Sequence, residues 1–273
     1  MTVLEGILLG VLQGLTEFLP VSSSGHLALA QRLLGVTTPG VRFEVLVHLA
    51  TAVAVVALFR RRVAAVLGAL AAWPFRHVRG ARRWSAAQAA DARLGFHLAL
   101  GTVPAAVVGY LFESRVEQAF DDVRLVSGLL IVTGFVLWST RLVTGRGRSA
   151  ETWRDALVVG VAQAAAVLPG LSRSGATVSA GLLGGLDRRR AAEFSFLLSV
   201  PIIVGAAAVN LSDAFRAGAA PPPAEVAGAV VAFVCALPAI AVFVKAISAG
   251  RVHRFSYYCW AVGAVGLLLT AMP

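Results

Sequence analysis

The amino-acid sequence predicts an all-α integral membrane protein with six transmembrane helices and two re-entrant helical hairpins, arranged as an inverted repeat. Of its 273 residues, 58% are hydrophobic and only 14% are charged, whereas an average soluble domain has about 25% charged residues. Long uncharged runs alternate with arginine-rich connections, and two shorter runs share a motif. So few charges cannot cover a water-soluble globule of this size, which excludes an ordinary cytosolic enzyme.

The uncharged runs give the expected transmembrane helices. A bilayer core about 30 Å thick needs about 20 helical residues, and shorter runs suffice where polar ends reach the interface. Six runs without Asp, Glu, Lys or Arg fit, namely 45–59, 94–112, 125–140, 194–212, 226–244 and 255–273. A further run, 63–75, ends at Trp73-Pro74 among arginines and is expected to be an interfacial helix.

Two pairs of shorter runs are interrupted by a single charge. They are 6–16 with 18–31, split by Glu17, and 156–172 with 174–186, split by Arg173. The charged connections agree with an alternating topology only if each pair enters and leaves the membrane on one side. We therefore expect each pair to form a re-entrant hairpin.

The distribution of basic residues predicts the topology. Basic residues concentrate in the connections 60–93, 141–154, 188–190 and 245–254, whereas 113–124 and 213–225 have no such excess. The positive-inside rule places the first four in the cytoplasm and the other two outside. The triple arginine 188–190 is thus interpreted as a topology anchor. The net charge of +10 reflects this topology, so no nucleic-acid partner is expected.

An internal repeat relates the two hairpins. Gly10, Val11, Gln13, Ser22, Ser24 and Gly25 match Gly160, Val161, Gln163, Ser172, Ser174 and Gly175, 150 residues later. We expect one membrane domain over 1–273, with halves of about 1–143 and 150–273 in opposite orientation. Short, Gly/Pro-interrupted segments at matching places in two halves indicate a binding site at the membrane midplane.

The first hairpin reads QGLTEFLPVSSSGH from Gln13 to His26. Gln13 and Glu17 are four residues apart and share a helix face. Pro20 is expected to end that helix, and Gly25 to permit a tight turn into the next. A carboxylate at membrane depth costs at least about 2.5 to 3.5 kcal/mol unless it is paired or hydrated. Glu17 is therefore expected to face a partner, a metal or a water-filled cavity.

The second hairpin reads LPGLSRSGATVSAG from Leu168 to Gly181. Small residues at the start of a half-helix leave backbone N–H groups free for an anion. The planar guanidinium of Arg173 suits a phosphate group. This segment is interpreted as an anion cradle.

Simpler interpretations stay open for several of these residues. Glu17 and Arg173 could be a structural ion pair, Ser22, Ser23 and Ser24 could be packing residues, and His26 could be a satisfied buried histidine. His48 and His97 are interpreted as structural, and Cys235 and Cys259 as small packing residues. Convergence of the polar residues on two repeat-related hairpins favours a functional site.

Both motifs, with EFSFLLSVP from Glu193 to Pro201 and with Phe43-Glu44, resemble the undecaprenyl-diphosphate phosphatase family, also called the bacitracin resistance proteins. The resemblance implies hydrolysis of undecaprenyl diphosphate to undecaprenyl phosphate and inorganic phosphate, with Mg²⁺ or Ca²⁺, at the outer face of the bacterial plasma membrane. It thereby implies recycling of the lipid carrier for cell-wall synthesis and resistance to bacitracin.

The resemblance and the hairpin chemistry together define the candidate site. The catalytic candidates are Glu17, Ser23, His26 and Arg173, and the substrate-binding candidates are Ser22, Ser24, Ser172, Ser174, Gly175 and Thr177. Glu17 and Gln13 are the candidate metal ligands, although many family members have Glu where this chain has Gln13. Either Ser23, activated by His26, attacks the phosphate, or His26 activates a water.

A transporter is the alternative function, because inverted repeats with broken helices are also the plan of secondary transporters. Such a protein would move a polyprenyl phosphate across the membrane. A hydroxyl and an imidazole beside an arginine favour the enzyme, since transport needs no nucleophile. The expected partners are the polyprenyl diphosphate and the bilayer, and a homodimer is left open.

Overall fold

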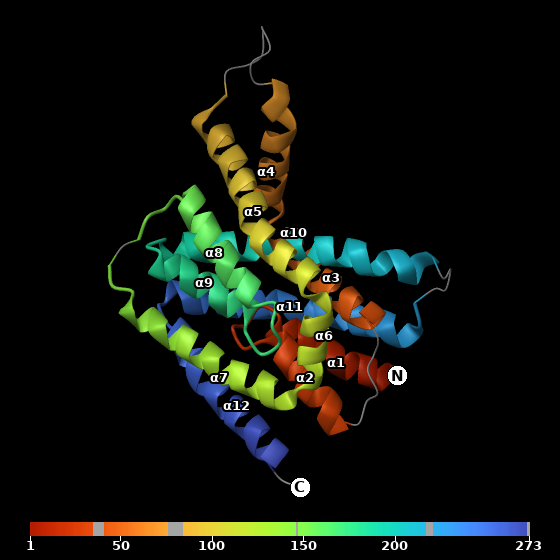
Figure 1. The fold of residues 1–273 in the computed structure, drawn as a ribbon. Coiled ribbons are helices and arrows are strands. Elements are labelled where there is room, and N and C mark those ends of the chain that lie inside the picture. Colours follow the sequence, from red (N-terminus) through yellow and green to blue (C-terminus); the bar gives the residue numbers. More distant parts are fainter. Residues whose placement is uncertain (35–40, 76–83, 146, 217–220, 272–273) are drawn as a thin grey trace.

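The computed structural model describes residues 1–34, 41–75, 84–145, 147–216 and 221–271, and this part of the chain is helical without any strand (Figure 1). The α-helices are α1 Val3–Thr16, α2 Ser23–Leu34, α3 Val41–Leu58, α4 Arg60–Ala72, α5 Ala86–Leu111, α6 Glu113–Asp121, α7 Val123–Ser139, α8 Trp153–Ala165, α9 Arg173–Leu183, α10 Arg188–Arg216, α11 Pro223–Ser248 and α12 Phe255–Ala271. Three short 3₁₀ helices are η1 Trp73–Phe75, η2 Thr140–Leu142 and η3 Val252–Arg254. The all-α prediction is confirmed.

Several of these helices can cross a membrane. In the described part of the chain, four are long and apolar enough, namely α5, α7 continued by η2, α10 and α11. The pair of α3 and α4, bent by 88°, makes up to five. They cover five of the six predicted runs. The sixth run, 255–273, contains α12, and its last two residues lie outside the described part of the chain. The chain is thus a helical, multi-pass membrane protein.

Two long helices, α5 and α10, begin before the uncharged runs that the sequence analysis used as helix boundaries, and they include charged residues. α5 begins at Ala86, because Ser85 and Gln88 form a capping box there, and Asp91 in its early turns pairs with Arg62. α10 begins at Arg188, and Arg190 in its first turn pairs with Glu151 and with Glu193. Ion pairs with neighbouring helices allow these charges to continue the helices.

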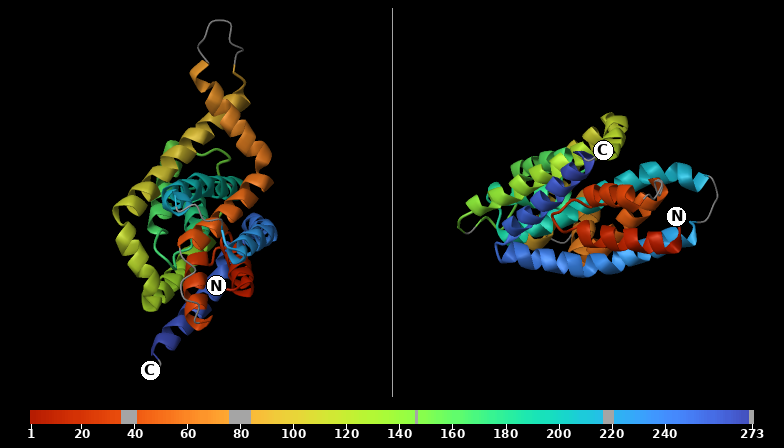
Figure 2. Two further views of the ribbon diagram at one scale, coloured as in Figure 1. Left: turned by 90° about the vertical axis from the view of Figure 1, so that its right-hand side faces the viewer. Right: turned by 90° about the horizontal axis from the view of Figure 1, so that it is seen from below.

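Helices α1, α3, α10 and α11 form one packed layer, while α5 packs on α8 and α7 on α12 (Figure 2). α4 and the start of α5 project together from this body (Figure 1). Glycines bring two of these pairs close: a Cβ on Gly10 of α1 would lie 2.3 Å from the carbonyl oxygen of Gly228, and one on Gly160 of α8 would lie 2.6 Å from that of Gly101. Small residues permit such close helix contacts in membrane proteins.

Three phenylalanine rings form a row through the core. The Phe18 ring, just after α1, lies 5.7 Å from that of Phe196 on α10, which lies 5.8 Å from that of Phe59 at the α3–α4 bend. Phe18 and Phe196 are buried. This aromatic row separates the end of α1 from the bend.

The connection into α8 is tied to the α9–α10 turn. The Arg148 N–H donates to the Gly185 carbonyl (2.8 Å), and the Asp187 N–H donates to the Arg148 carbonyl (2.8 Å). The Arg148 guanidinium donates two hydrogen bonds, of 2.9 and 2.8 Å, to the carboxylate of Asp155. These bonds lower the pKa of Asp155 from 3.8 to about 2.

We expect Asp155→Asn to lower the midpoint of thermal unfolding at pH 7, by about 2 to 4 °C for each kcal/mol lost in a chain of this size. Because the pKa of Asp155 is depressed on folding, its contribution is complete above the unfolded value of 3.8 and is lost as the pH falls toward 2. The unfolding midpoints of the variant and the parent, measured in detergent, should therefore converge between pH 4 and 2. The exposed Asp121 provides the matched control, Asp121→Asn, which should track the parent at every pH.

Candidate functional site

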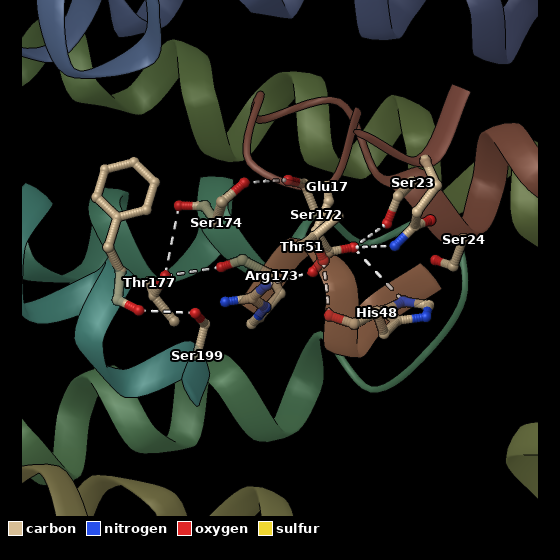
Figure 3. Close-up of polar contacts among 12 residues, drawn as sticks. Glu17, Ser23, Ser24, His48, Thr51, Ser172, Arg173, Ser174, Thr177 and Ser199 are labelled. Carbon is tan, nitrogen blue, oxygen red and sulfur yellow. Dashed lines mark hydrogen bonds and ion pairs between the residues drawn. The ribbon is translucent and has the colours of Figure 1, made fainter. Parts of the chain in front are cut away.

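The two hairpins meet at an ion pair. Glu17, the residue after α1, pairs with Arg173, the first residue of α9 (Figure 3). Their side chains are 5% and 14% exposed. The contact that the sequence suggested between the two interrupting charges is therefore present.

Three further side chains surround one oxygen of the Glu17 carboxylate. The Gln13 amide donates to Oε2 (2.9 Å). The Ser23 hydroxyl donates to the same oxygen (2.6 Å), and His48 Nε2 lies 3.5 Å from it (Figure 3). The contact with Gln13 confirms that residues 13 and 17 share a helix face. Removing a carboxylate from water is costly unless its lone pairs are satisfied, and here both oxygens have partners.

His48 belongs to this cluster, so its interpretation as a structural residue was incomplete. It lies on α3, and its Nδ1 contacts the Glu44 carbonyl (2.7 Å), which directs Nε2 toward Glu17. The signal in the sequence was an ionisable residue inside an otherwise uncharged run, which by default indicates function in a membrane protein.

The turn of the first hairpin is made by Ser22 rather than Gly25. Ser22 has φ = 66°, a left-handed conformation that is uncommon without glycine. Gly25 lies in the first turn of α2, where an added Cβ would approach the Gly170 Cα to 3.3 Å. α1 ends at Thr16, so Pro20 lies in the turn that follows and does not terminate the helix. The expected roles of Gly25 and Pro20 were therefore wrong.

The second hairpin repeats the cap of the first. The Gly175 N–H donates to the Ser172 hydroxyl (3.1 Å), which lies 3.2 Å from that of Ser174. In the first hairpin, the Gly25 N–H donates to the Ser22 hydroxyl (3.3 Å), which lies 3.2 Å from that of Ser24. The serines that the repeat aligned therefore have the same local bonds.

Hydrogen-bond donors remain free at the start of α9. Within the described ranges, no acceptor faces the backbone N–H of Arg173 or of Ser174. Arg173 donates to Glu17 through Nη2, which leaves four of its five N–H donors available. Unpaired N–H groups at a helix start and a guanidinium together suit an oxyanion.

Ser174 and Thr177 contact other parts of the protein. The Ser174 hydroxyl donates to the Leu19 carbonyl (3.2 Å), which joins the hairpins. The Thr177 hydroxyl contacts the Arg173 carbonyl (2.8 Å) and the Ser195 hydroxyl (2.6 Å). Both residues are almost fully buried. Substrate binding by Ser22, Ser24, Ser172, Ser174, Gly175 and Thr177 stays a prediction.

His26 contacts residues other than Ser23. Its Nδ1 lies 2.8 Å from the Ser22 carbonyl, and its Nε2 lies 2.8 Å from the hydroxyl of Tyr258, whose ring stacks on the imidazole. Since a carbonyl only accepts, Nδ1 carries the hydrogen in this arrangement. The expected Ser23–His26 contact is not formed, because Ser23 donates to Glu17 instead. The sequence analysis did not select Tyr258 on α12, which contacts this candidate histidine.

A divalent cation would find few protein ligands here. No group of three or more His, Cys, Asp or Glu side chains suited to a metal occurs within the described residues. Oε1 of Gln13 is buried without a hydrogen-bond partner beside Glu17. One carboxylate with one amide oxygen fits a hard cation that takes its other ligands from substrate oxygens and waters.

Known proteins resemble the chain over nearly its whole length. Proteins named undecaprenyl-diphosphatase are 39% identical in Desulforapulum autotrophicum (272 residues; 98% of each chain), 42% in Syntrophotalea carbinolica (269 residues; 97% of this chain and 98% of the relative) and 38% in Mycolicibacterium gilvum (275 residues; 98% and 97%). The family model described as "Bacitracin resistance protein BacA" matches residues 6–265. With both hairpins inside that match, the chain belongs to the bacitracin resistance protein BacA family.

Proposed function

We propose that this membrane protein hydrolyses undecaprenyl diphosphate to undecaprenyl phosphate and inorganic phosphate. The observation that carries the proposal is the buried Glu17–Arg173 pair, with the Ser23 hydroxyl on the same carboxylate. The relatives named undecaprenyl-diphosphatase support the choice of substrate. The reaction would regenerate the lipid carrier for peptidoglycan synthesis and deplete the diphosphate that bacitracin sequesters.

Arg173 and the start of α9 would bind the terminal phosphate. Phosphoryl transfer mainly requires that the spreading negative charge is neutralised and that nucleophile and leaving group are aligned. The free N–H donors of Arg173 serve the first need. Phe18, whose ring centroid lies 5.7 Å from the guanidinium carbon, limits the access of water on one side.

Ser23 is the nucleophile in this proposal, and Glu17 is its base. The Ser23 proton would pass to Glu17 while Oγ bonds to the terminal phosphorus, and the bond from phosphorus to the bridging oxygen would break as undecaprenyl phosphate leaves. A water would then hydrolyse the phosphoserine and release phosphate. The 2.6 Å contact of Ser23 with Glu17 favours Glu17 over His26 in this role.

A divalent cation, Mg²⁺ or Ca²⁺, is part of the proposal. Glu17 and Gln13 would hold it, and when bound it would neutralise charge on the diphosphate. The orphaned Oε1 of Gln13 supports this assignment.

We expect Gln13→Glu to remain active and to reach half-maximal rate at a lower Mg²⁺ concentration, because a second carboxylate binds a hard cation more strongly than an amide does. Glu17→Gln should be inactive at every Mg²⁺ concentration. Phosphate release measured across a Mg²⁺ titration gives both results. Gln163, the repeat-related residue on α8, supplies the control Gln163→Glu, which should not lower the Mg²⁺ requirement. An unchanged requirement in Gln13→Glu would place residue 13 outside the metal shell.

Phosphate release by the detergent-solubilised chain tests the reaction itself. Farnesyl or undecaprenyl diphosphate with Mg²⁺ or Ca²⁺ should yield inorganic phosphate. A polyprenyl-phosphate transporter would yield none, because transport requires two compartments. Release no faster than in a Glu17→Gln, Arg173→Gln control would reject the phosphatase and leave the transporter.

The six-span inverted repeat, with the active site facing outside, is also our proposal. The matching caps at Ser22 and Ser172 support it. So does the pairing of α1 with α11 and of α8 with α5 through repeat-related glycines, Gly10 and Gly160. In this arrangement the arginine-rich connection 60–93 lies in the cytoplasm and α6 lies outside.

Cysteine labelling of intact cells tests that orientation. In a background without Cys235 and Cys259, an impermeant thiol reagent should modify Glu117→Cys on α6 and spare Ala87→Cys at the start of α5. Both positions are exposed, so their accessibility to the reagent depends only on the side of the membrane on which they lie. Lysed cells provide the control, since both positions should then react. Labelling of Ala87→Cys in intact cells would contradict the orientation.

A further inference from the structure

A second basic site lies at the bend between α3 and α4. A cavity of about 660 Å³ is lined there by four arginines, Arg60, Arg61 and Arg62 from the first turn of α4 and Arg189 from that of α10. Leu58 and Phe59 contribute apolar walls, as does Val244 near the end of α11. The cavity thus has a positively charged part, formed by the arginines, and an apolar part, which includes Leu58 and Phe59.

The arginines outnumber the acidic groups available to them. Glu193 is the carboxylate in the lining, and it already pairs with Arg62 (2.7 Å) and with Arg190 (3.0 Å). Within the described chain, Arg61 and Arg189 have no carboxylate within 4.0 Å, and both are exposed. At least two positive charges therefore face the cavity without a counter-charge.

The backbone adds to this positive potential. The start of α4 has no side-chain cap, because the side chain of its N-cap residue, Phe59, has no acceptor atom. The Phe59 carbonyl accepts from the N–H of Arg62 (2.8 Å) and Val63 (2.9 Å), and within the described residues no backbone acceptor faces the N–H of Arg60 or Arg61. Free N–H groups at the start of a 13-residue helix carry partial positive charge. Arg60 and Arg61 are the first two residues of this uncapped helix. The helix start and the arginine side chains therefore both favour an anionic ligand.

The aromatic row separates this cavity from the polar cluster around Glu17. Phe59 lines the cavity, Phe18 lies against Arg173, and the buried Phe196 lies between them. A ligand in the cavity therefore does not reach Glu17 or Ser23.

We propose that this cavity binds the phosphate headgroup of an anionic phospholipid. The unpaired arginines match the phosphate charge, and the apolar walls beside them suit the start of an acyl chain. Basic pockets between membrane helices bind such headgroups through this combination. A free phosphate ion would use the arginines but would leave the apolar walls against water. The proposal requires that the chain lies in a bilayer and is independent of the catalytic assignment.

The test is binding of dioleoylphosphatidylglycerol to the full, detergent-solubilised chain, titrated by native mass spectrometry. The parent should bind it more tightly than dioleoylphosphatidylcholine. Each arginine near a phosphate contributes about fivefold in affinity, so Arg61→Gln with Arg189→Gln should weaken phosphatidylglycerol binding about 25-fold. Ala65→Glu, which places a negative charge in the lining, should weaken it as well. The matched control, Arg93→Gln with Arg115→Gln, removes two other exposed arginines and should leave binding unchanged.

Three results of the lipid titrations would overturn the proposal. They are equal binding of both lipids, unchanged binding in the Arg61, Arg189 variant, and an equal loss in the control. Inorganic phosphate and glycerol 3-phosphate serve as competitors, and displacement of the lipid at equimolar concentration would identify a site for a free anion instead. Phosphate release from farnesyl diphosphate should persist in the Arg61, Arg189 variant, so failure of the lipid site and failure of the proposed phosphatase are distinguishable.

Discussion

Arg173→Lys should lose about 100- to 1,000-fold in turnover although the positive charge is retained. An ammonium keeps the attraction to Glu17 but cannot reproduce the planar fork that binds two phosphate oxygens. Losing one such transition-state contact costs about 2.7 to 4 kcal/mol, by analogy with an oxyanion-hole donor. The measurement is kcat for phosphate release from farnesyl diphosphate at saturating Mg²⁺.

Arg190 provides the matched control for Arg173. Its side chain is 11% exposed, against 14% for Arg173, and it also pairs with a buried glutamate, Glu151, but it has no contact with Glu17. Arg190→Lys should keep most of the turnover, and any loss should follow the amount of folded protein. Near-parental kcat in Arg173→Lys would identify the Glu17–Arg173 contact as a structural ion pair, which is the alternative that the sequence left open.

Ser23→Ala should reduce turnover by at least about 100-fold, because it removes the hydroxyl that Glu17 is placed to deprotonate. If the two residues act as one unit, Glu17→Gln added to Ser23→Ala should cost little more. Single-turnover phosphate release in the two single variants and the double variant gives this comparison. Rapid-quench detection of a phosphoserine in the parent would identify the intermediate directly.

Ser139→Ala is the control for loss of a hydroxyl. Ser139 donates to the Val136 carbonyl of its own helix (2.6 Å), away from the cluster, and should be dispensable. Substantial activity in Ser23→Ala would transfer the attack to water. His26→Ala then becomes informative, because His26 contacts Tyr258 rather than Ser23 and would have to reorient to activate that water.

The repeat predicted that the two hairpins share one site, and a Glu17–Arg173 ion pair was one of the alternatives that the sequence left open. Glu17 and Arg173 each interrupt an apolar run, and a charge in such a run needs a partner, a metal or a water-filled cavity. Helical spacing placed Gln13 and Glu17 on one helix face, because the two residues are four positions apart. These predictions needed no knowledge of the path of the chain between the hairpins.

The contacts that the sequence did not reveal depend on that path. His48 on α3 contacts Glu17, and Tyr258 on α12 contacts His26. Residue spacing within the first hairpin does not predict either contact, because both partners come from other helices. The direction of Ser23 depends on the left-handed backbone of Ser22, which a run of three serines does not specify. The starts of α5 and α10 were misplaced because partners distant in sequence neutralise charges in the early turns of these helices, Asp91 in α5 and Arg190 in α10.

The shared cap gives Ser23 and Arg173 equivalent places, since each directly follows the serine that caps its turn. A symmetric dimer of single hairpins would carry one side chain at both places, either two hydroxyls or two guanidinium groups. Because the two turns lie at different positions of one chain, their residues can differ. One turn can then carry the proposed nucleophile, Ser23, and the other the phosphate-binding guanidinium of Arg173. The asymmetry that phosphoryl transfer requires can thus arise by a single divergence between two copies of one turn.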